Sequence, residues 1–169
     1  MSGHSVTAGV RQGLLIRGAI FTVFVPGVVG GWLPSAIADT PLAGGVWHAG
    51  WLLVALGTAI YLSCLARFLT AGGTPSIYFS RPIRFLIGEE PGSLVTRGLY
   101  QRTRNPMYVG VLTVITGQAI LFASVRVAIY GLVMFVLLTA VVILLEEPHL
   151  RRERGAAYED YCGRVPRWL

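Results

Sequence analysis

The ionisable side chains with the most distinctive spacing are one arginine and an adjacent pair of glutamates. Arg104 precedes one apolar run, and Glu146 and Glu147 directly follow another. Adjacent carboxylates raise each other's pKa unless a cation compensates, and a partly desolvated carboxylate such as Glu147 can act as a general base. The same charges also serve as simple boundary residues at the ends of membrane helices. The residue types alone leave both interpretations open.

A metal site has little support in the sequence. Glu146 and His149 have the Glu-x-x-His spacing of one half of a carboxylate-bridged di-metal site, but the sequence has no second such motif. Cys64 and Cys162 form neither a CxxC pair nor part of a ligand cluster. We therefore predict two free thiols and no bound metal.

The elements that position these residues follow from composition. Of the 169 residues, 54% are hydrophobic and only 13% are charged, whereas soluble domains carry about 25% charged residues. Because a bilayer-crossing helix needs about 20 apolar residues, the apolar runs predict an all-α integral membrane bundle of four transmembrane helices in one domain, residues 1–169. The predicted spans are residues 18–38, 46–69, 107–123 and 127–145, with a cytosolic loop at 70–106 and an interfacial helical tail at 148–163.

The first span has a second interpretation. Arg11 and Arg17 precede its apolar core, and Ala36-Ile37-Ala38 follow it, which also resembles a signal peptide with a small-residue cleavage site. Because this stretch is long for a signal, we expect it to be retained as a helix.

A tight turn joins the last two predicted spans. Residues 124–126 alone separate them, so the two helices must form an antiparallel hairpin. Counted from Val125, Arg104 lies 21 residues before the turn and Glu146 lies 21 residues after it. Arg104, Glu146 and Glu147 are therefore expected to meet at the mouth of this hairpin.

The distribution of arginines predicts an orientation. All 14 basic residues are arginines, and 13 of them flank the predicted spans on one side. The positive-inside rule then places both termini and the 70–106 loop in the cytosol. These arginines stand at the ends of apolar runs and are not interleaved with stacking aromatics, so no nucleic-acid partner is expected. Gly27 and Gly31 are too ordinary a pattern to predict an oligomeric state.

The loop and the tail are the expected surroundings of the hairpin mouth. Loops longer than about 12 to 15 residues are usually functional or disordered, and the apolar residues of this loop favour packing on the membrane surface. In the tail, Pro148 suits a helix start and Gly163 a helix end. The apolar stripe of that predicted helix consists of Leu150, Ala157, Tyr158 and Tyr161.

Asn105-Pro106 predicts a capped helix start whose first-turn N–H groups attract carboxylates, although a plain helix start explains the pair equally well. The tyrosines near the same interface either form an aromatic belt or contact a ligand. They are Tyr100, Tyr108, Tyr158 and Tyr161.

Several short motifs over about residues 70–169 occur in a familiar order and spacing. They are LVTRGLY at 94–100, RNPMYVG at 104–110, EEPHL at 146–150, then Gly155, Tyr158, Tyr161 and VPRW at 165–168. Together they resemble the isoprenylcysteine carboxyl methyltransferase and phospholipid methyltransferase superfamily. The resemblance implies an integral-membrane, S-adenosylmethionine-dependent methyltransferase whose cofactor pocket is formed by the loop, the hairpin mouth and the tail.

The resemblance also implies roles for individual residues. Glu146 would pair with the ammonium group of S-adenosylmethionine, the helix-start N–H groups or Arg104 would hold its carboxylate, and Leu94 and Val95 would flank its adenine. The full set of implied cofactor contacts is Ser93, Leu94, Val95, Tyr100, Asn105, Pro106, Met107, Tyr108 and Glu146. The catalytic candidates are Arg104 and Glu147, and the substrate-binding candidates are Val142, Tyr158, Tyr161 and Arg167.

The acceptor is the least determined part of the prediction. Val142 stands where the carboxylate-methylating eukaryotic members of the superfamily carry an arginine, which disfavours an isoprenylcysteine carboxylate. A membrane lipid or a lipidated or lipophilic small molecule is expected, methylated on a carboxylate, amine or thiol. The alternative is a non-catalytic membrane assembly or interaction protein on the same scaffold.

Overall fold

The computed structural model describes residues 13, 16, 18–20, 22–38, 47–73 and 92–169. Every regular element in these ranges is helical, which confirms the all-α fold class. The predicted first turn, residues 39–45, residue 46 of the predicted second span, and residues 74–91 of the predicted cytosolic loop lie outside the described residues.

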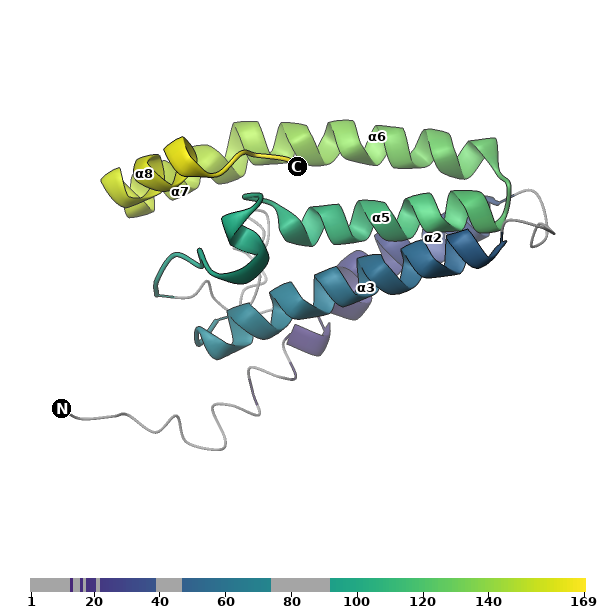
Figure 1. The fold of residues 1–169 in the computed structure, drawn as a ribbon, viewed down its shortest axis with the longest axis horizontal. Helices are drawn as coiled ribbons and strands as arrows, with labels where there is room; N and C mark the ends of the chain where they lie inside the picture. The colour runs from purple at the N-terminus through teal and green to yellow at the C-terminus, as the bar shows by residue number, and fades with distance from the viewer. Residues whose placement is uncertain (1–12, 14–15, 17, 21, 39–46, 74–91) are drawn as a thin grey trace.

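Three long helices form the body of the structure: α3 (Trp47–Thr70), α5 (Pro106–Leu121) and α6 (Val125–Val141). In Figure 1, α5 lies between the other two, and the π-helix η1 (Val23–Trp32) and α2 (Leu33–Ile37) lie behind them. Only residues 122–124 join α5 to α6, and the Ser124 hydroxyl accepts a hydrogen bond from the Val127 N–H at the start of α6 (3.4 Å). The predicted antiparallel hairpin is therefore confirmed, with its turn two residues earlier than expected.

Two of the described helices are long and apolar enough to cross a membrane. They are α3, with 24 residues, and the continuous helix of 30 residues from Val125 to Arg154. α5 has only 16 residues, about 24 Å at 1.5 Å per residue, which is shorter than a hydrocarbon core of about 30 Å. The described part of the first predicted span is mostly η1 and the five-residue α2. The arrangement of four spans thus stays a prediction.

α3 and α5 touch through facing glycines. Gly50 faces Gly117 and Gly57 faces Gly110, so the two pairs are seven residues apart on each antiparallel helix. A Cβ atom added to Gly57 would lie 2.5 Å from the Gly110 carbonyl oxygen, and one added to Gly117 would lie 2.8 Å from the Gly50 carbonyl oxygen. The backbones are therefore in direct contact, as small residues allow between membrane helices.

This seam predicts a large effect of a small substitution. Gly57→Ala places a methyl group against backbone atoms of α5, which cannot rotate away as a side chain can, so we expect a loss of about 1 to 3 kcal/mol of unfolding free energy. Thermal unfolding in detergent measures the loss. Gly31→Ala is the matched control, because an added Cβ meets nothing within 4 Å there. Equal melting temperatures for the two variants would contradict the seam.

Side chains of the hairpin attach η1 to the bundle. Pro34 has no amide hydrogen, so the turn before it lacks one backbone donor. Two side chains donate to carbonyls of that turn: Tyr130 Oη to the Val29 oxygen (2.7 Å) and Gln118 Nε2 to the Gly30 oxygen (2.5 Å). The polar groups of η1 and the hairpin therefore satisfy each other inside an apolar bundle.

The tail differs from its prediction. α6 continues through a π-turn, η4 (Val142–Glu146), into α7 (Glu147–Arg154), and α8 (Ala156–Arg164) follows Gly155, whose φ is +51°. A single helix over 148–163 is therefore wrong. Pro148 does not start a separate helix, because the wide π-turn, closed by the Glu147 N–H on the Val142 oxygen, lets the chain continue. Gly163 lies within α8, which ends at Arg164, and Ala157 is exposed rather than part of a buried stripe.

Candidate functional site

The hairpin brings Arg104 and Glu147 together, as the similar distances of Arg104 and the acidic pair from the turn predict. Arg104 Nη1 lies 3.1 Å from Glu147 Oε1, with Arg104 just before α5 and Glu147 at the start of α7. We call this end of the hairpin, where η4 meets the start of α5, the hairpin mouth. The meeting of Arg104 with Glu147 is thus a property of the fold, and the two residues are more than simple boundary charges.

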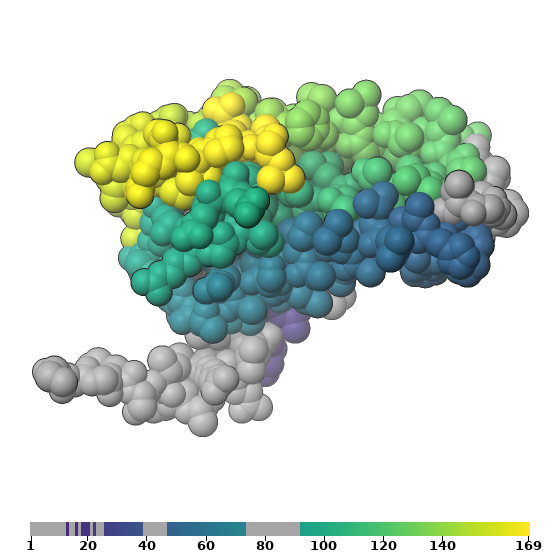
Figure 2. Space-filling model, in the orientation of Figure 1, coloured from purple at the N-terminus to yellow at the C-terminus, as the bar shows by residue number. Residues whose placement is uncertain are grey.

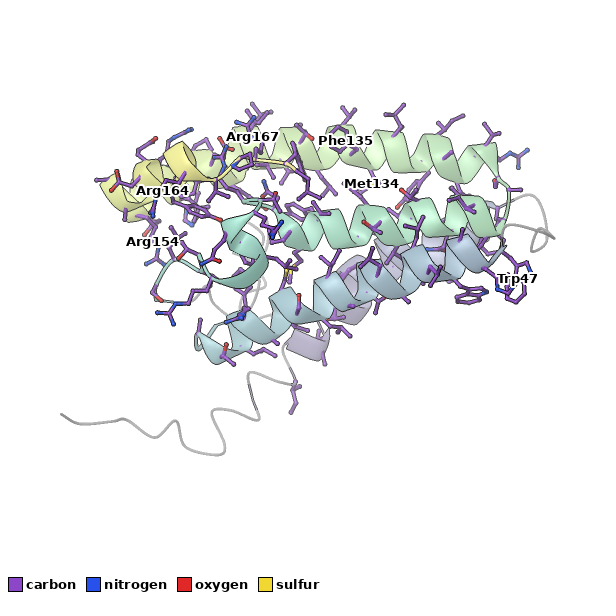
Figure 3. The ribbon with its side chains drawn as sticks, viewed as in Figure 1. Trp47, Met134, Phe135, Arg154, Arg164 and Arg167 are labelled. Atoms are coloured by element: carbon purple, nitrogen blue, oxygen red, sulfur yellow. The ribbon has the colours of Figure 1, made fainter. Side chains whose placement is uncertain are left out.

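Glu147 is the centre of an ion-pair cluster. Its side chain is only 4% exposed, and Arg167 donates to both of its oxygens, from Nε to Oε1 at 2.6 Å and from Nη2 to Oε2 at 3.1 Å. Arg151, one turn later on α7, adds a contact of 3.7 Å. Figure 3 shows Arg167 beside the helix that carries Glu147. Each oxygen of the carboxylate therefore faces guanidinium groups.

This environment disfavours the predicted role of Glu147 as a general base. Burial raises the pKa of Glu147, but the hydrogen bonds from Arg167 and the charges of Arg104, Arg167 and Arg151 outweigh burial, so the net pKa is lowered. A carboxylate with a lowered pKa and two occupied oxygens accepts a proton poorly. The contacts instead make Glu147 a residue that positions its neighbours.

Glu146 has a different environment from its neighbour. Tyr108, in the first turn of α5, donates a hydrogen bond from its hydroxyl group to Glu146 Oε1. Glu146 is the last residue of the π-turn η4 and Glu147 the first of α7, so the acidic pair divides its side chains between two sets of partners. Glu146 is half-buried and Glu147 is buried. The less enclosed carboxylate is therefore Glu146, the one implied to hold the cofactor.

The end of the chain lies across the residues before α5. We call residues 165–169 the C-terminal strap. The Arg104 N–H donates to the Pro166 oxygen (2.9 Å), and Thr103 Oγ1 and Asn105 Nδ2 donate to the Arg167 oxygen (2.9 and 3.0 Å). Asn105 therefore does not cap α5 with its side chain, contrary to the prediction, because its amide group serves the strap. The first-turn N–H groups of α5 have no side-chain cap.

Two predicted substrate-binding tyrosines lie inside a packed cluster. Tyr158 and Tyr161 of α8 are 2% and 5% exposed and pack with Val165, and Leu94 covers this cluster. Tyr161 Oη donates to the Tyr100 oxygen (2.6 Å), and burial raises the pKa of Tyr161 to about 12. Leu94 is thereby placed against tyrosines. The environment of both tyrosines is a packed interior, which favours a structural role over direct contact with a substrate.

Tyr100 connects the same region to α3. It belongs to the short helix η3 (Gly98–Gln101), and its ring meets Phe68 of α3 edge-on at a centroid distance of 5.9 Å. Burial raises the pKa of Tyr100, so its hydroxyl stays protonated. The buried Tyr100 joins the predicted cofactor loop to the helical body.

The remaining predicted residues have varied surroundings. Ser93 is exposed and Val95 half-buried, Pro106 starts α5 in a buried position, and Met107 beside it is half-buried. Val142 is 2% exposed in the π-turn below Glu146. Their implied contacts with cofactor or substrate stay predictions.

Sequence reasoning missed three contributors to the site. Arg151 joins the Glu147 cluster, and Cys162 accepts a hydrogen bond on its sulfur from Arg104 Nη1 (2.8 Å). Trp168 packs on Phe135 of α6 with a centroid distance of 5.3 Å. The sequence signal for Arg151 was its spacing of four residues from Glu147. The contacts of Cys162 and Trp168 depend on how α8 and the strap fold back.

Among the described residues no group of three His, Cys, Asp or Glu side chains could hold a metal ion.

Comparison with known proteins adds one match. The model of the family described as phospholipid methyltransferase matches residues 46–156, more than half of the chain. No curated protein and no solved structure matched. The matched range contains α3, the hairpin, the acidic pair and α7.

Proposed function

The chain belongs to the phospholipid methyltransferase family, and from this premise we propose that it transfers a methyl group from S-adenosylmethionine to a lipophilic acceptor at the cytosolic membrane face. The observation that carries the proposal is the position of Glu146. Its half-buried carboxylate lies at the hairpin mouth, bonded to Tyr108 and next to the start of α5.

The residues at the hairpin mouth fit the charged end of this cofactor. S-adenosylmethionine carries an ammonium and a carboxylate group on one carbon, so its site needs an anion and a set of donors side by side. Glu146 supplies the anion, and a charge-assisted hydrogen bond to an ammonium is stronger than a neutral one. The N–H groups of the first turn of α5 have no side-chain cap and attract carboxylates.

Arg104 offers a second donor near the same place. Its Nε is buried and makes no hydrogen bond to the part of the chain that the structure describes, although its Nη1 contacts Glu147 and Cys162. A buried donor without an acceptor is unfavourable, and a ligand carboxylate would satisfy it. Arg104 would then hold cofactor through Nε while its other nitrogens keep the ion-pair cluster together.

The chain's own contribution to methyl transfer is positioning. The bound cofactor supplies a methyl group on a positively charged sulfur, and transfer proceeds in line to a nucleophile. Holding two reactants in line can lower the barrier by up to about 7 to 11 kcal/mol. The ion pairs of Glu147 fix α7 and the strap to the start of α5, and the Tyr158–Tyr161 cluster covers the neighbouring loop. These contacts fix the positions of the elements around the mouth relative to one another.

The same proposal includes four membrane spans with the site on the arginine-rich side. After Arg126 in its first turn, the exposed side chains of α6 are apolar, including Leu132, Val136 and Leu137, whereas α7 exposes Arg151 and Arg152. A change from apolar to cationic exposure along one helix is typical of a bilayer boundary. The hairpin mouth lies at that change, where a membrane-bound acceptor and a soluble cofactor can both arrive.

Membranes that contain the protein, incubated with methyl-labelled S-adenosylmethionine, test the proposal. We expect label in the lipid-extractable fraction, and label that survives base treatment would identify N- or S-methylation rather than a methyl ester. Membranes with the Glu146→Ala variant serve as the blank. Equal labelling in both membranes, or no cofactor binding to the purified protein, would remove the enzymatic proposal and leave a non-catalytic role on this scaffold.

A further inference from the structure

Thr103, just before α5, is a buried polar residue to which the proposed reaction gives no role. The residue is only 2% exposed. Its hydroxyl group donates to the Arg167 oxygen (2.9 Å) and accepts a hydrogen bond from the Asn105 N–H (3.3 Å). The hydroxyl group is thus used both as a donor and as an acceptor, as a buried threonine requires. Because Thr103 has almost no free surface, any effect of this residue on a ligand must pass through its neighbours.

Arg167 links Thr103 to the acidic pair. Its carbonyl oxygen accepts from Thr103 and from Asn105 Nδ2 (3.0 Å), while its guanidinium group donates to both oxygens of Glu147. The two donors to the carbonyl fix the backbone of the strap, and the two bonds of the guanidinium group fix the direction of the side chain. In Figure 2 the C-terminal residues, in yellow, lie on the surface directly against the teal residues that precede α5.

The contacts form a closed ring at the start of α5. Arg104 follows Thr103 in the chain, and its Nη1 lies 3.1 Å from Glu147 Oε1. Thr103 is therefore connected to Glu147 by two routes, one through the side chain of Arg104 and one through the strap. A satisfied network of this kind restricts movement more than one ion pair does, because each member limits the positions of the next.

The ring sets the spacing between the two halves of the proposed cofactor site. Glu146 directly precedes Glu147, and the first turn of α5 directly follows Asn105. S-adenosylmethionine carries its ammonium and its carboxylate group on one carbon, so the Glu146 carboxylate and the N–H groups of α5 must lie at one fixed separation. Errors in such a separation are costly, since a displacement of about 1 Å can lower a rate about 100-fold.

We infer that Thr103 is a positioning residue: by holding the Arg167 carbonyl it fixes the strap on the hairpin mouth and so keeps Glu146 at the distance from α5 that S-adenosylmethionine requires. The inference rests on the proposed function, because it names a residue that adjusts the same cofactor site without touching the cofactor. The family match does not contain this contact, since the matched residues end at 156 and the strap begins at 165.

Titration of the full-length protein in detergent with S-adenosylmethionine tests the role of Thr103. Thr103→Val keeps the size of the side chain and removes the hydroxyl group, so the dissociation constant should rise about three- to tenfold, the equivalent of one net hydrogen bond. Thr103→Ser keeps the hydroxyl group and should keep most of the affinity. Thr113→Val is the matched control. Its hydroxyl group bonds within α5, to the Val109 oxygen (2.7 Å), so its removal should leave the dissociation constant unchanged.

A double-mutant cycle separates positioning from a general loss of stability. Arg167→Met leaves the strap carbonyl in place and removes the guanidinium link to Glu147. If Thr103 acts through this link, adding Thr103→Val to Arg167→Met should change the dissociation constant less than about twofold, because the two substitutions interrupt one route. An independent structural effect of Thr103 would give the same factor in both backgrounds.

Trypsin reports on the strap itself. Cleavage after Arg167 requires its guanidinium group to leave Glu147 and enter the protease, so the cleavage rate measures how often the strap opens. Intact mass spectrometry detects the loss of Trp168 and Leu169. Cleavage should be faster in Thr103→Val than in the wild-type protein, Thr103→Ser or Thr113→Val.

The outcomes distinguish this inference from the proposed function. If the wild-type protein binds S-adenosylmethionine and Thr103→Val binds it equally well, the positioning role is overturned and the cofactor site remains. An equal loss of affinity from Thr103→Val in both backgrounds, or unchanged cleavage after Arg167, would also overturn it. No binding by the wild-type protein would remove the proposed function, and with it the cofactor role of Thr103, even if cleavage of Thr103→Val were faster.

Discussion

Glu146→Ala should weaken binding of S-adenosylmethionine at least about 30-fold, because truncating one partner of an enclosed charged pair costs 2 kcal/mol or more. The ammonium group of the cofactor would lose its anion, and the Tyr108 hydroxyl would lose the acceptor that it has in the protein. Calorimetric titration of the detergent-solubilised protein measures the dissociation constant. Glu146→Gln keeps a hydrogen-bond acceptor but no charge. Its dissociation constant should lie between those of the wild-type protein and Glu146→Ala.

Glu153→Ala is the matched control for this prediction. Glu153 is an exposed carboxylate on α7, two turns beyond Glu146, and its removal changes the net charge by the same amount. Its dissociation constant should equal that of the wild-type protein. If Glu146→Ala bound the cofactor as tightly as Glu153→Ala, the ammonium site would have to lie elsewhere.

Glu147→Ala should lower the unfolding free energy by about 3 to 5 kcal/mol, because it leaves buried guanidinium charge without its counter-ion. Of the three arginines paired with Glu147, Arg104 is the most enclosed, with a side chain only 12% exposed. Its charge is therefore the least compensated by water when Glu147 is removed. Thermal unfolding in detergent measures the effect. Arg151→Ala should cost much less, since this side chain is 45% exposed and its contact with Glu147 is the longest.

The same carboxylate predicts a pH dependence of stability. The pKa of Glu147 is lowered from 4.5 by the net effect of its surroundings, so its contribution is complete above about pH 4.5. It is lost as the pH falls through the lower pKa of the folded protein. Wild-type protein should therefore lose more stability than Glu147→Gln when the pH is lowered below 4.5. Parallel melting curves for the two proteins over that range would contradict the ion-pair cluster.

The meeting of Arg104 with the acidic pair could be predicted because it depends on local quantities. A turn of three residues forces two helices to run antiparallel, and equal distances from the turn then bring residues to one depth. The family resemblance over the last hundred residues identified the same segments. Neither the turn geometry nor the family resemblance could show that Glu146 and Glu147 have separate partners. That difference depends on a π-turn that no residue type predicts.

The glycine seam and the strap were beyond prediction for another reason. Gly50, Gly57, Gly110 and Gly117 are ordinary residues in an apolar sequence until α3 and α5 are set in register. The hydrogen bonds between the strap and residues 103–105 join positions more than sixty residues apart, such as Thr103 and Arg167. Their formation depends on where α8 turns after Gly155.

The sequence by itself determined the helical class, the hairpin and the charged residues at its mouth, because composition, helix rise and turn length are local properties of the chain. Only the tertiary structure decided which carboxylate is enclosed by arginines, which tyrosines are buried and where the last residues lie. Those outcomes depend on packing between segments that are distant in the sequence. The energy of an ion pair or of a buried donor depends on which groups this packing brings into contact.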